Sequence, residues 1–257
     1  PQKNPLDEAT ATLREAINYA TNAFNRCEQS RRGQKKESLP VLVSFLHMIQ
    51  MTDAIEVLLS SGCGPPASVL LRSSFESKLA VQYILEGDSK RRGYAWLVCH
   101  VLQEIEALER FGSAKFSETL STEGLGGMPA EELAELPSVI KQLKSKLELP
   151  GFVEAHSEYQ RLRMERRVGR LEWYALHGGP STVRGLARHL HQETLYQTLY
   201  HSTSRVVHGQ DINHLLFPMK DGPSVFAHLR DPLKILPVIG DALTFLLEVT
   251  FLVLREY

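Results

Sequence analysis

The chain is poor in cysteine and has almost no net charge, and both features exclude certain classes of protein. Its 257 residues include three cysteines and no Cys-x-x-Cys pair, so neither a disulfide framework nor a cysteine-rich zinc site is indicated. With 29 basic and 30 acidic residues, the formal net charge is -1, which gives no overall field toward nucleic acid or an anionic membrane. The first residues lack the basic and apolar regions of an export signal. We therefore expect a cytoplasmic protein.

Several signatures of bound groups are also missing. The Gly-Leu-Gly-Gly run at 124–127 has no preceding strand and no following Gly-Lys-Ser/Thr, so it does not predict a phosphate-binding loop. His189 and His191 would point about 200° apart on a helix, and two turns would separate His201 from His208. Neither spacing brings two imidazoles to one ion. We expect no metal and no cofactor.

Helical periodicity runs through the chain, and no strand pattern of useful length interrupts it. The four clearest segments lie in the N-terminal half, at 6–30, 38–61, 65–86 and 89–112. Short connections between helices favour antiparallel neighbours. The sequence therefore predicts an all-α helical bundle.

The expected organisation is a single domain over residues 1–257. Its bundle core would comprise about 38–113 and 181–257, with a mobile helical insertion at about 114–172. Within the insertion, residues 117–130 are glycine-rich and lack periodicity, so we expect a flexible loop there.

One stretch raises the question of a membrane. Residues 235–254, ILPVIGDALTFLLEVTFLVL, have the length of a span, but Pro237, Asp241 and Glu248 interrupt them. A charge at the centre of a bilayer costs about 2.5–3.5 kcal/mol on insertion scales. We therefore expect no membrane span, and interpret this segment as a buried apolar helix of the bundle.

An arginine and a glutamate interrupt an otherwise apolar helix. Residues 68–85, SVLLRSSFESKLAVQYIL, place Arg72 and Glu76 four residues apart, so both side chains lie on one face. On an exposed face, the two would form a surface ion pair that contributes only about 0.2–0.5 kcal/mol. The apolar flanks leave little room for a polar stripe, so we expect the pair to be buried and to need partners.

The best source of partners is a second polar helix. In LYHSTSRVVHGQ, residues 199–210, Tyr200, Ser204 and His208 share one face, while His201 and Arg205 lie on a face offset by one residue. If the first face meets the arginine–glutamate pair, the glutamate raises the pKa of His208 toward the range useful for proton transfer. The alternative is a structural hydrogen-bond network that fixes the register of the helices.

These two segments carry a family resemblance. The pattern is Arg-Ser-x-x-Glu after a small residue and leucines, followed much later by Tyr-x-x-x-Ser-x-x-x-His with glycine or proline after the histidine. Over roughly residues 38–210, the chain resembles the uncharacterised bacterial domain-of-unknown-function family 5677. That family is similar to the broad HEPN class of helical domains. Many HEPN domains are metal-independent ribonucleases of toxin and phage-defence systems, and others are binding modules.

The first hypothesis is therefore an enzyme that acts on RNA or nucleotides. His208 would be its general acid and base, with Glu76 orienting the imidazole. Arg72 and Arg205 would stabilise the charge that develops on phosphate, which requires no metal. The usual HEPN signature has four to six residues between arginine and histidine, whereas two residues separate Arg205 from His208.

Substrate-binding residues are expected on the same helix and in one basic stretch. Tyr200, Ser204 and His201 would position the substrate. The stretch RLRMERRVGR, residues 161–170, is the best phosphate-binding segment, with Arg166 and Arg167 at its centre. Just beyond it, Trp173 and Tyr174 would stack on bases. A solvated helix face is the alternative interpretation of this stretch.

The second hypothesis is a non-catalytic interaction domain, with a homodimer as its expected form. The same polar residues would then brace the bundle, and the apolar C-terminal helix would provide a self-association face. Exposure discriminates between the two hypotheses, because an enzyme needs its polar residues in an open cleft and a brace has them sealed.

Overall fold

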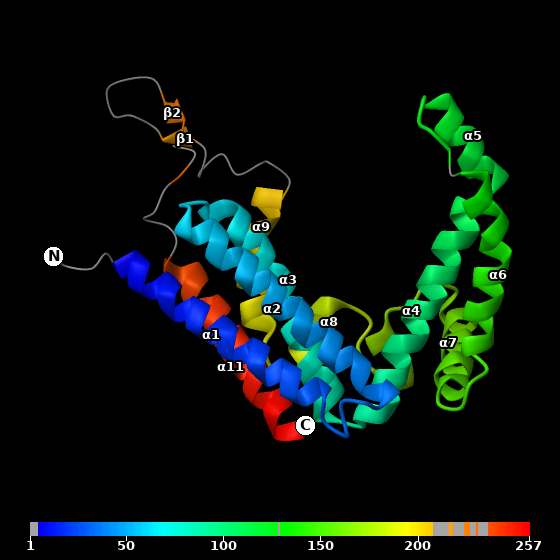
Figure 1. The fold of residues 1–257 in the computed structure, drawn as a ribbon, viewed down its shortest axis with the longest axis horizontal. Helices are drawn as coiled ribbons and strands as arrows, with labels where there is room; N and C mark the ends of the chain where they lie inside the picture. Colours follow the sequence, from blue (N-terminus) through cyan, green and yellow to red (C-terminus); the bar gives the residue numbers. More distant parts are fainter. Residues whose placement is uncertain (1–4, 128, 208–215, 218–223, 227–229, 231–235) are drawn as a thin grey trace. The chain divides into compact units, whose positions relative to one another are not determined.

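Helices form almost all of the regular structure. In this computed structural model, the residues described are 5–127, 129–207, 216–217, 224–226, 230 and 236–257 (Figure 1). Within them, two-residue strands β1 (Leu216–Phe217) and β2 (Val225–Phe226) form one antiparallel pair, and no other strand occurs. The prediction of an all-α fold is confirmed.

The helix bounds agree closely with the periodic segments of the sequence. The first five helices are α1 (Pro5–Glu28), α2 (Leu39–Ser60), α3 (Gly64–Glu86), α4 (Ser89–Phe111) and α5 (Ala114–Thr122). The later ones are α6 (Ala130–Lys146), α7 (Phe152–Arg166), α8 (Val183–His189), α9 (Glu193–Val207) and α11 (Leu236–Glu256). Two short 3-10 helices are η1 (Lys36–Ser38) and η2 (Trp173–Gly178).

The chain divides into two compact units. Unit 1 combines Pro1–Gly87 with Val183–Tyr257, and unit 2 is Asp88–Thr182. The sequence placed the helix at 89–112 in the bundle core, but α4 belongs to unit 2, where it packs against α6, α7 and η2. That the whole chain forms a single domain stays a prediction.

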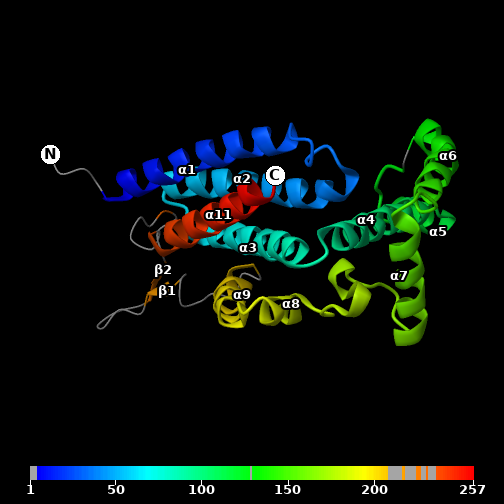
Figure 2. The ribbon, with the colours of Figure 1, turned by 90° about the horizontal axis from the view of Figure 1, so that it is seen from below.

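Unit 1 is a bundle in which α1, α2, α3 and α11 lie alongside one another (Figure 2). Its core contains fully buried Phe45, Phe75 and Leu246, and the rings of Phe75 and Phe245 are 5.6 Å apart. Helices α8 and α9 pack on α3, beside this four-helix group. This packing places one face of α9 against α3.

The C-terminal helix buries one face and exposes part of the other. Ala242, Phe245, Leu246 and Val249 of α11 are buried in unit 1, as predicted, whereas Phe251 is 60% exposed. Among the described residues, Lys36–Ser60 and Leu236–Glu256 are long and apolar enough to cross a membrane by length and composition. The absence of a membrane span stays a prediction.

Unit 2 has a hydrophobic core of its own around α4. Val98 and Cys99 of α4 pack with Leu143, Ala155 and other buried residues from the rest of the unit. Asp88 caps α4 by accepting a hydrogen bond from the backbone N–H of Arg91 at 3.0 Å.

The loop expected at 117–130 is partly wrong, because α5 continues to Thr122. None of the residues of α5 is buried, so no buried apolar stripe predicted this helix from the sequence. Ser113 caps it by accepting a hydrogen bond from the backbone N–H of Phe116 at 3.3 Å.

Candidate functional site

The arginine and glutamate of α3 meet a tyrosine of α9. The hydroxyl of Tyr200 donates a hydrogen bond to Oε1 of Glu76. Nε of Arg72 donates to the same oxygen at 3.3 Å. The guanidinium carbon of Arg72 lies 3.7 Å from the centroid of the Tyr200 ring, within the range of a cation–π contact. We call Arg72, Glu76 and Tyr200 the α3–α9 cluster.

A second tyrosine extends the cluster along α9. The ring of Tyr196 stacks on that of Tyr200, with centroids 4.0 Å apart and an interplanar angle of 29°. A guanidinium and a ring at these distances cannot share one face of Tyr200, so Arg72 and Tyr196 take its two faces. The phenol is thereby held on both sides and at its hydroxyl.

Electrostatics in the cluster follow from these contacts. Burial and the hydrogen bond to Glu76 raise the pKa of Tyr200 above its ordinary value, so the phenol stays protonated and remains a donor. For Arg72, burial alone would lower the pKa, but its contacts with Tyr200 and Glu76 outweigh that effect and raise it. The cluster therefore combines a fixed cation, a carboxylate acceptor and a neutral phenol.

The expected burial of the arginine–glutamate pair is wrong. The side chain of Arg72 is 31% exposed and that of Glu76 is 43% exposed. The flanking residues Leu71 and Phe75 are buried, but the face of α3 that carries the pair is only partly covered. The cluster is reached by solvent.

A histidine of α2 contacts the serine of the first motif. His47 Nε2 and Ser73 Oγ lie 3.0 Å apart, and Ser73 follows Arg72 in the sequence. This contact links α2 to α3 beside the cluster.

Several predicted site residues fall outside what the structure describes. His208 lies outside the described residues altogether. For His201, Ser204 and Arg205, the structure describes only the helical backbone of α9. The prediction that these four residues join the site stays untested by the structure.

The basic stretch lies in unit 2. Arg166 and Arg167 are exposed at the C-terminal end of α7, where Arg167 adopts a left-handed backbone conformation. Tyr174 is buried in unit 2, so the expectation that it stacks on bases is wrong. Trp173 is half-buried, with its ring centroid 5.4 Å from that of Tyr174.

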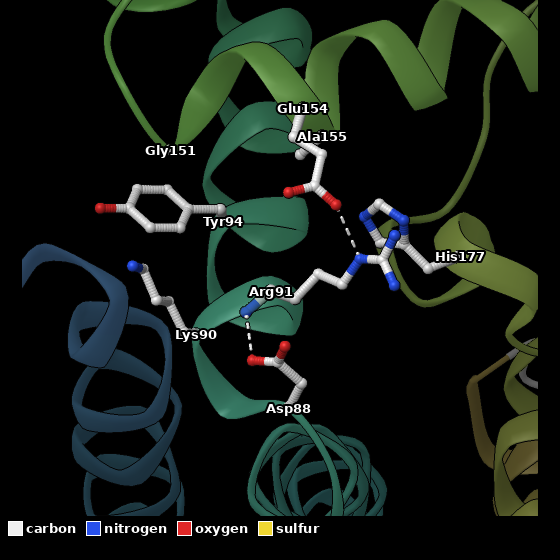
Figure 3. A pocket seen from close by; sticks show the side chains of 8 residues that line it. All are labelled: Asp88, Lys90, Arg91, Tyr94, Gly151, Glu154, Ala155 and His177. Atoms are coloured by element: carbon white, nitrogen blue, oxygen red, sulfur yellow. Dashed lines mark hydrogen bonds and ion pairs between the residues drawn. The ribbon is translucent and has the colours of Figure 1, made fainter.

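Two groups of charged residues were missed from the sequence. Lys78 is buried, and its Nζ lies 2.6 Å from Oε2 of Glu248 on α11. The argument that singled out Arg72 in an apolar helix applies equally to Lys78 and would have found it. In unit 2, Arg91, Glu154 and His177 line a cavity (Figure 3), and their separation in sequence gave no signal.

Metal-ligating side chains do not gather in the part of the chain that the structure describes. There, no group of three or more histidine, cysteine, aspartate or glutamate side chains lies close enough to hold a metal ion.

Comparison with known proteins places the chain in one family. No curated protein and no solved structure matches it. The family described as "Family of unknown function (DUF5677)" matches residues 39–222, which is most of the chain. The matched region contains Arg72, Ser73, Glu76 and the later Tyr-x-x-x-Ser-x-x-x-His motif. The chain therefore belongs to this family of unknown function, DUF5677.

Proposed function

We propose that this protein is HEPN-like and acts on RNA or nucleotides as a metal-independent ribonuclease of the toxin or phage-defence type. The observation that carries the proposal is the α3–α9 cluster, in which a partly exposed arginine is held by a carboxylate and a phenol. Such a group suits an anionic substrate, since guanidinium donors bind phosphate oxygens strongly. The helix that supplies Tyr200 also carries Arg205, and His208 follows Val207, the last residue of that helix, in the sequence.

The proposed reaction is attack within the RNA chain. A base, for which we propose His208, takes the proton of a ribose 2′-hydroxyl, and the 2′-oxygen forms a bond to the adjacent phosphorus. The bond from phosphorus to the 5′-oxygen breaks, and the imidazolium of His208, formed when the base took up its proton, gives that proton to the leaving oxygen. Arg72 and Arg205 stabilise the additional negative charge on phosphate, and positioning together with this electrostatic stabilisation supplies most of the rate enhancement.

Each described residue of the cluster has a part in this proposal. Glu76 fixes Arg72 and Tyr200 through its Oε1. The ring of Tyr200 lies against the guanidinium of Arg72, so this cation is oriented before substrate binds. Ser204 and His201, with Tyr200, position the substrate, and Arg166 and Arg167 add phosphate contacts. A cytoplasmic homodimer is proposed as the working form.

The experiment is RNA cleavage by the purified chain in the presence of a metal chelator. We expect His208→Ala to lower the rate by about 10²–10⁴, as loss of general acid–base catalysis does, with a melting temperature within a few degrees of the parent. Arg72→Ala should also lower the rate. Arg188→Ala is the matched control, because Arg188 is exposed and paired with Glu193 at 2.7 Å. Cleavage that survives both His208→Ala and Arg72→Ala would refute the proposal.

A non-catalytic interaction domain is the second candidate. The contacts of Tyr200 with Arg72 and Glu76 favour it, because they join α3 to α9 as a brace does. Under this alternative, Arg72→Ala lowers the melting temperature and no RNA cleavage is measured for the parent protein. Sedimentation velocity then tests whether the domain dimerises.

A further inference from the structure

A cavity in unit 2 lies where the first turns of α4 and α7 meet η2. Its volume is about 620 Å³, which is within the usual range for a site that binds a small organic molecule. Lys90, Arg91 and Tyr94 of α4, Glu154 of α7 and His177 of η2 line it (Figure 3).

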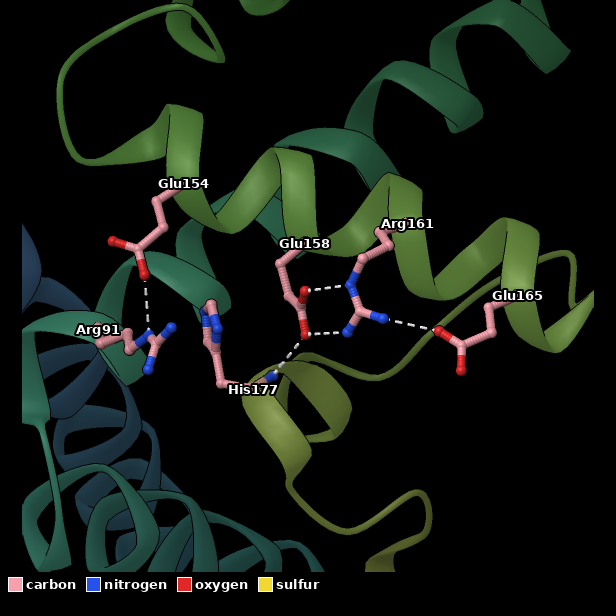
Figure 4. Close-up of polar contacts among 6 residues, drawn as sticks. All are labelled: Arg91, Glu154, Glu158, Arg161, Glu165 and His177. Atoms are coloured by element: carbon pink, nitrogen blue, oxygen red, sulfur yellow. Dashed lines mark hydrogen bonds and ion pairs between the residues drawn. The ribbon is translucent and has the colours of Figure 1, made fainter.

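His177 is held in an unusual conformation at this cavity. Its backbone is left-handed, with φ 58° and ψ 36°, which is uncommon for a residue other than glycine. The backbone N–H donates to Oε1 of Glu158 at 3.3 Å, and Arg161 holds that carboxylate through two further hydrogen bonds (Figure 4). The strained turn is therefore fixed from α7, and strain of this kind concentrates at functional sites.

The imidazole has a buried atom with nothing to bond to. Nε2 of His177 is shielded from solvent and has no hydrogen-bond partner among the described residues. Buried polar atoms are nearly always paired, so an unpaired one at the wall of a cavity calls for an explanation. A ligand that brings a hydrogen-bonding group up to this ring would supply the missing partner.

The cavity wall also has more donors than acceptors left over. Nε of Arg91 donates to Glu154 at 2.9 Å, and Asp88 accepts from the backbone of Arg91. The terminal nitrogens of Arg91 and the ammonium of Lys90 have no partner among the described residues. Guanidinium and ammonium groups donate and never accept hydrogen bonds, so the ligand must bring acceptors.

Charge leads to the same kind of ligand. Two cations, Lys90 and Arg91, face two carboxylates, Asp88 and Glu154, both of which already accept hydrogen bonds. Burial, and then the charge of Arg91, lower the pKa of His177 below its ordinary value, against the opposite effects of the nearby carboxylates. Burial and Arg91 therefore favour the neutral imidazole, and an anion bound beside it would favour the protonated, donating form.

We propose that this cavity binds an organic phosphate monoester. The phosphate lies at the end formed by Arg91 and His177, and the organic part extends toward Tyr94 and Lys90. Figure 3 shows the imidazole beside the guanidinium, with the ring of Tyr94 and the ammonium of Lys90 farther to the left in the view. Phosphate offers three strong acceptor oxygens, enough for the guanidinium and the imidazole together. This site is separate from the proposed ribonuclease function.

The test is calorimetric titration of the full chain with three probes: adenosine 5′-monophosphate, inorganic phosphate and adenosine. We expect the monophosphate to bind most tightly, because it alone combines phosphate oxygens with an organic part. His177→Asn should weaken binding about tenfold, since asparagine tolerates a left-handed backbone but cannot become a cation. Lys90→Gln should weaken it by a smaller factor.

Two controls keep the result specific. Lys115→Gln changes an exposed lysine of unit 2 that does not line the cavity, and should bind like the parent. Arg188→Ala changes an exposed arginine of unit 1 that is paired with Glu193 at 2.7 Å, and should also bind like the parent. Binding of adenosine as tight as that of the monophosphate would overturn the proposal.

A structural role for His177 would not move its titration. In NMR spectra recorded against pH, we expect the ring signal of His177 to titrate at a higher pH with the monophosphate than without it. An unmoved titration at saturating ligand, or undiminished binding in both His177→Asn and Lys90→Gln, would contradict the proposed site.

Discussion

The three cysteines sit in different surroundings, so their thiols should react differently. Cys27 and Cys99 are buried, whereas Cys63 is partly exposed. Burial, with a smaller effect of Glu172, raises the pKa of Cys99 to about 12, and burial also raises the pKa of Cys27. A raised pKa leaves almost no thiolate at pH 8, and thiolate is the reactive form.

We therefore expect Cys63 alone to react quickly with a disulfide reagent at pH 8 in the folded protein. The released thiol, followed by absorbance, should correspond to Cys63 first and to all three cysteines after unfolding in guanidinium. Cys63→Ser should remove the fast phase. Fast reaction that persists in Cys63→Ser would contradict the burial of the other two.

Partial exposure also sets how much the α3–α9 cluster stabilises unit 1. A sealed ion pair would lose about 3–5 kcal/mol when one partner is removed. Because Arg72 and Glu76 are partly exposed, we expect Arg72→Ala to lower the free energy of unfolding by about 1 kcal/mol, from one screened ion pair and one cation–π contact. Urea unfolding measures this loss, and a loss above 3 kcal/mol would show that the cluster closes in solution.

Lys78, the most buried charged side chain among the described residues of unit 1, joins α3 to α11. The side chain of Lys78 is 5% exposed, and its ammonium lies over the ring of Phe245, 4.8 Å from the centroid. Glu248 is its ion-pair partner, and burial raises the pKa of Asp241 close by, with Lys78 acting in the opposite direction. The lysine therefore depends on α11 for its compensating charge.

Replacing Glu248 should lower the free energy of unfolding more than replacing Lys78. Glu248→Ala strands a buried ammonium, and we expect the free energy of unfolding to fall by about 2–3 kcal/mol, less than for a fully buried pair because Glu248 is half exposed. Lys78→Met keeps the packing and should change it by about 1 kcal/mol or less. Urea unfolding of both variants tests the order, with the exposed Glu15→Ala as control. A larger loss for Lys78→Met would reverse this account.

Helices with a clear apolar stripe were predictable from the sequence, whereas the exposed helix α5 was not. The segments expected at 38–61 and 65–86 became α2 and α3 almost to the residue, because buried apolar positions recur at the helical period. The exposed helix α5 was missed because its start depends on a serine cap.

The candidate site shows the same limit. Spacing correctly put Arg72 and Glu76 on one face of α3, and the same face meets Tyr200 of α9. Periodicity states which side chains share a face but not how much of that face a neighbouring helix covers, so exposure was wrong. The left-handed turn at His177 has no signal in the sequence at all.

At the scale of the whole molecule, unit 2 has the features of an independently folding segment. One cluster of its buried residues, from Ala95 to Leu176, lies entirely within Asp88–Thr182. A fragment of residues 88–182 should therefore be helical by circular dichroism and should unfold cooperatively on heating. A broad, non-cooperative melt would show that this core is insufficient.

Unit 2 also interrupts unit 1 in sequence, and this has a consequence for synthesis. The first helix of unit 1, α1, packs against the last one, α11. Helix α3 packs against α8 and α9, which also follow unit 2 in the sequence. A chain leaving the ribosome completes all of unit 2 while unit 1 still lacks its final helices. Because domains fold as units during synthesis, the apolar faces of α1, α2 and α3 that α8, α9 and α11 later cover stay exposed through that interval. Chaperones should therefore bind mainly to the earliest part of the chain. A ribosome stalled before α11 should hold a nascent protein in which unit 2 is folded and unit 1 is incomplete, with apolar surface exposed.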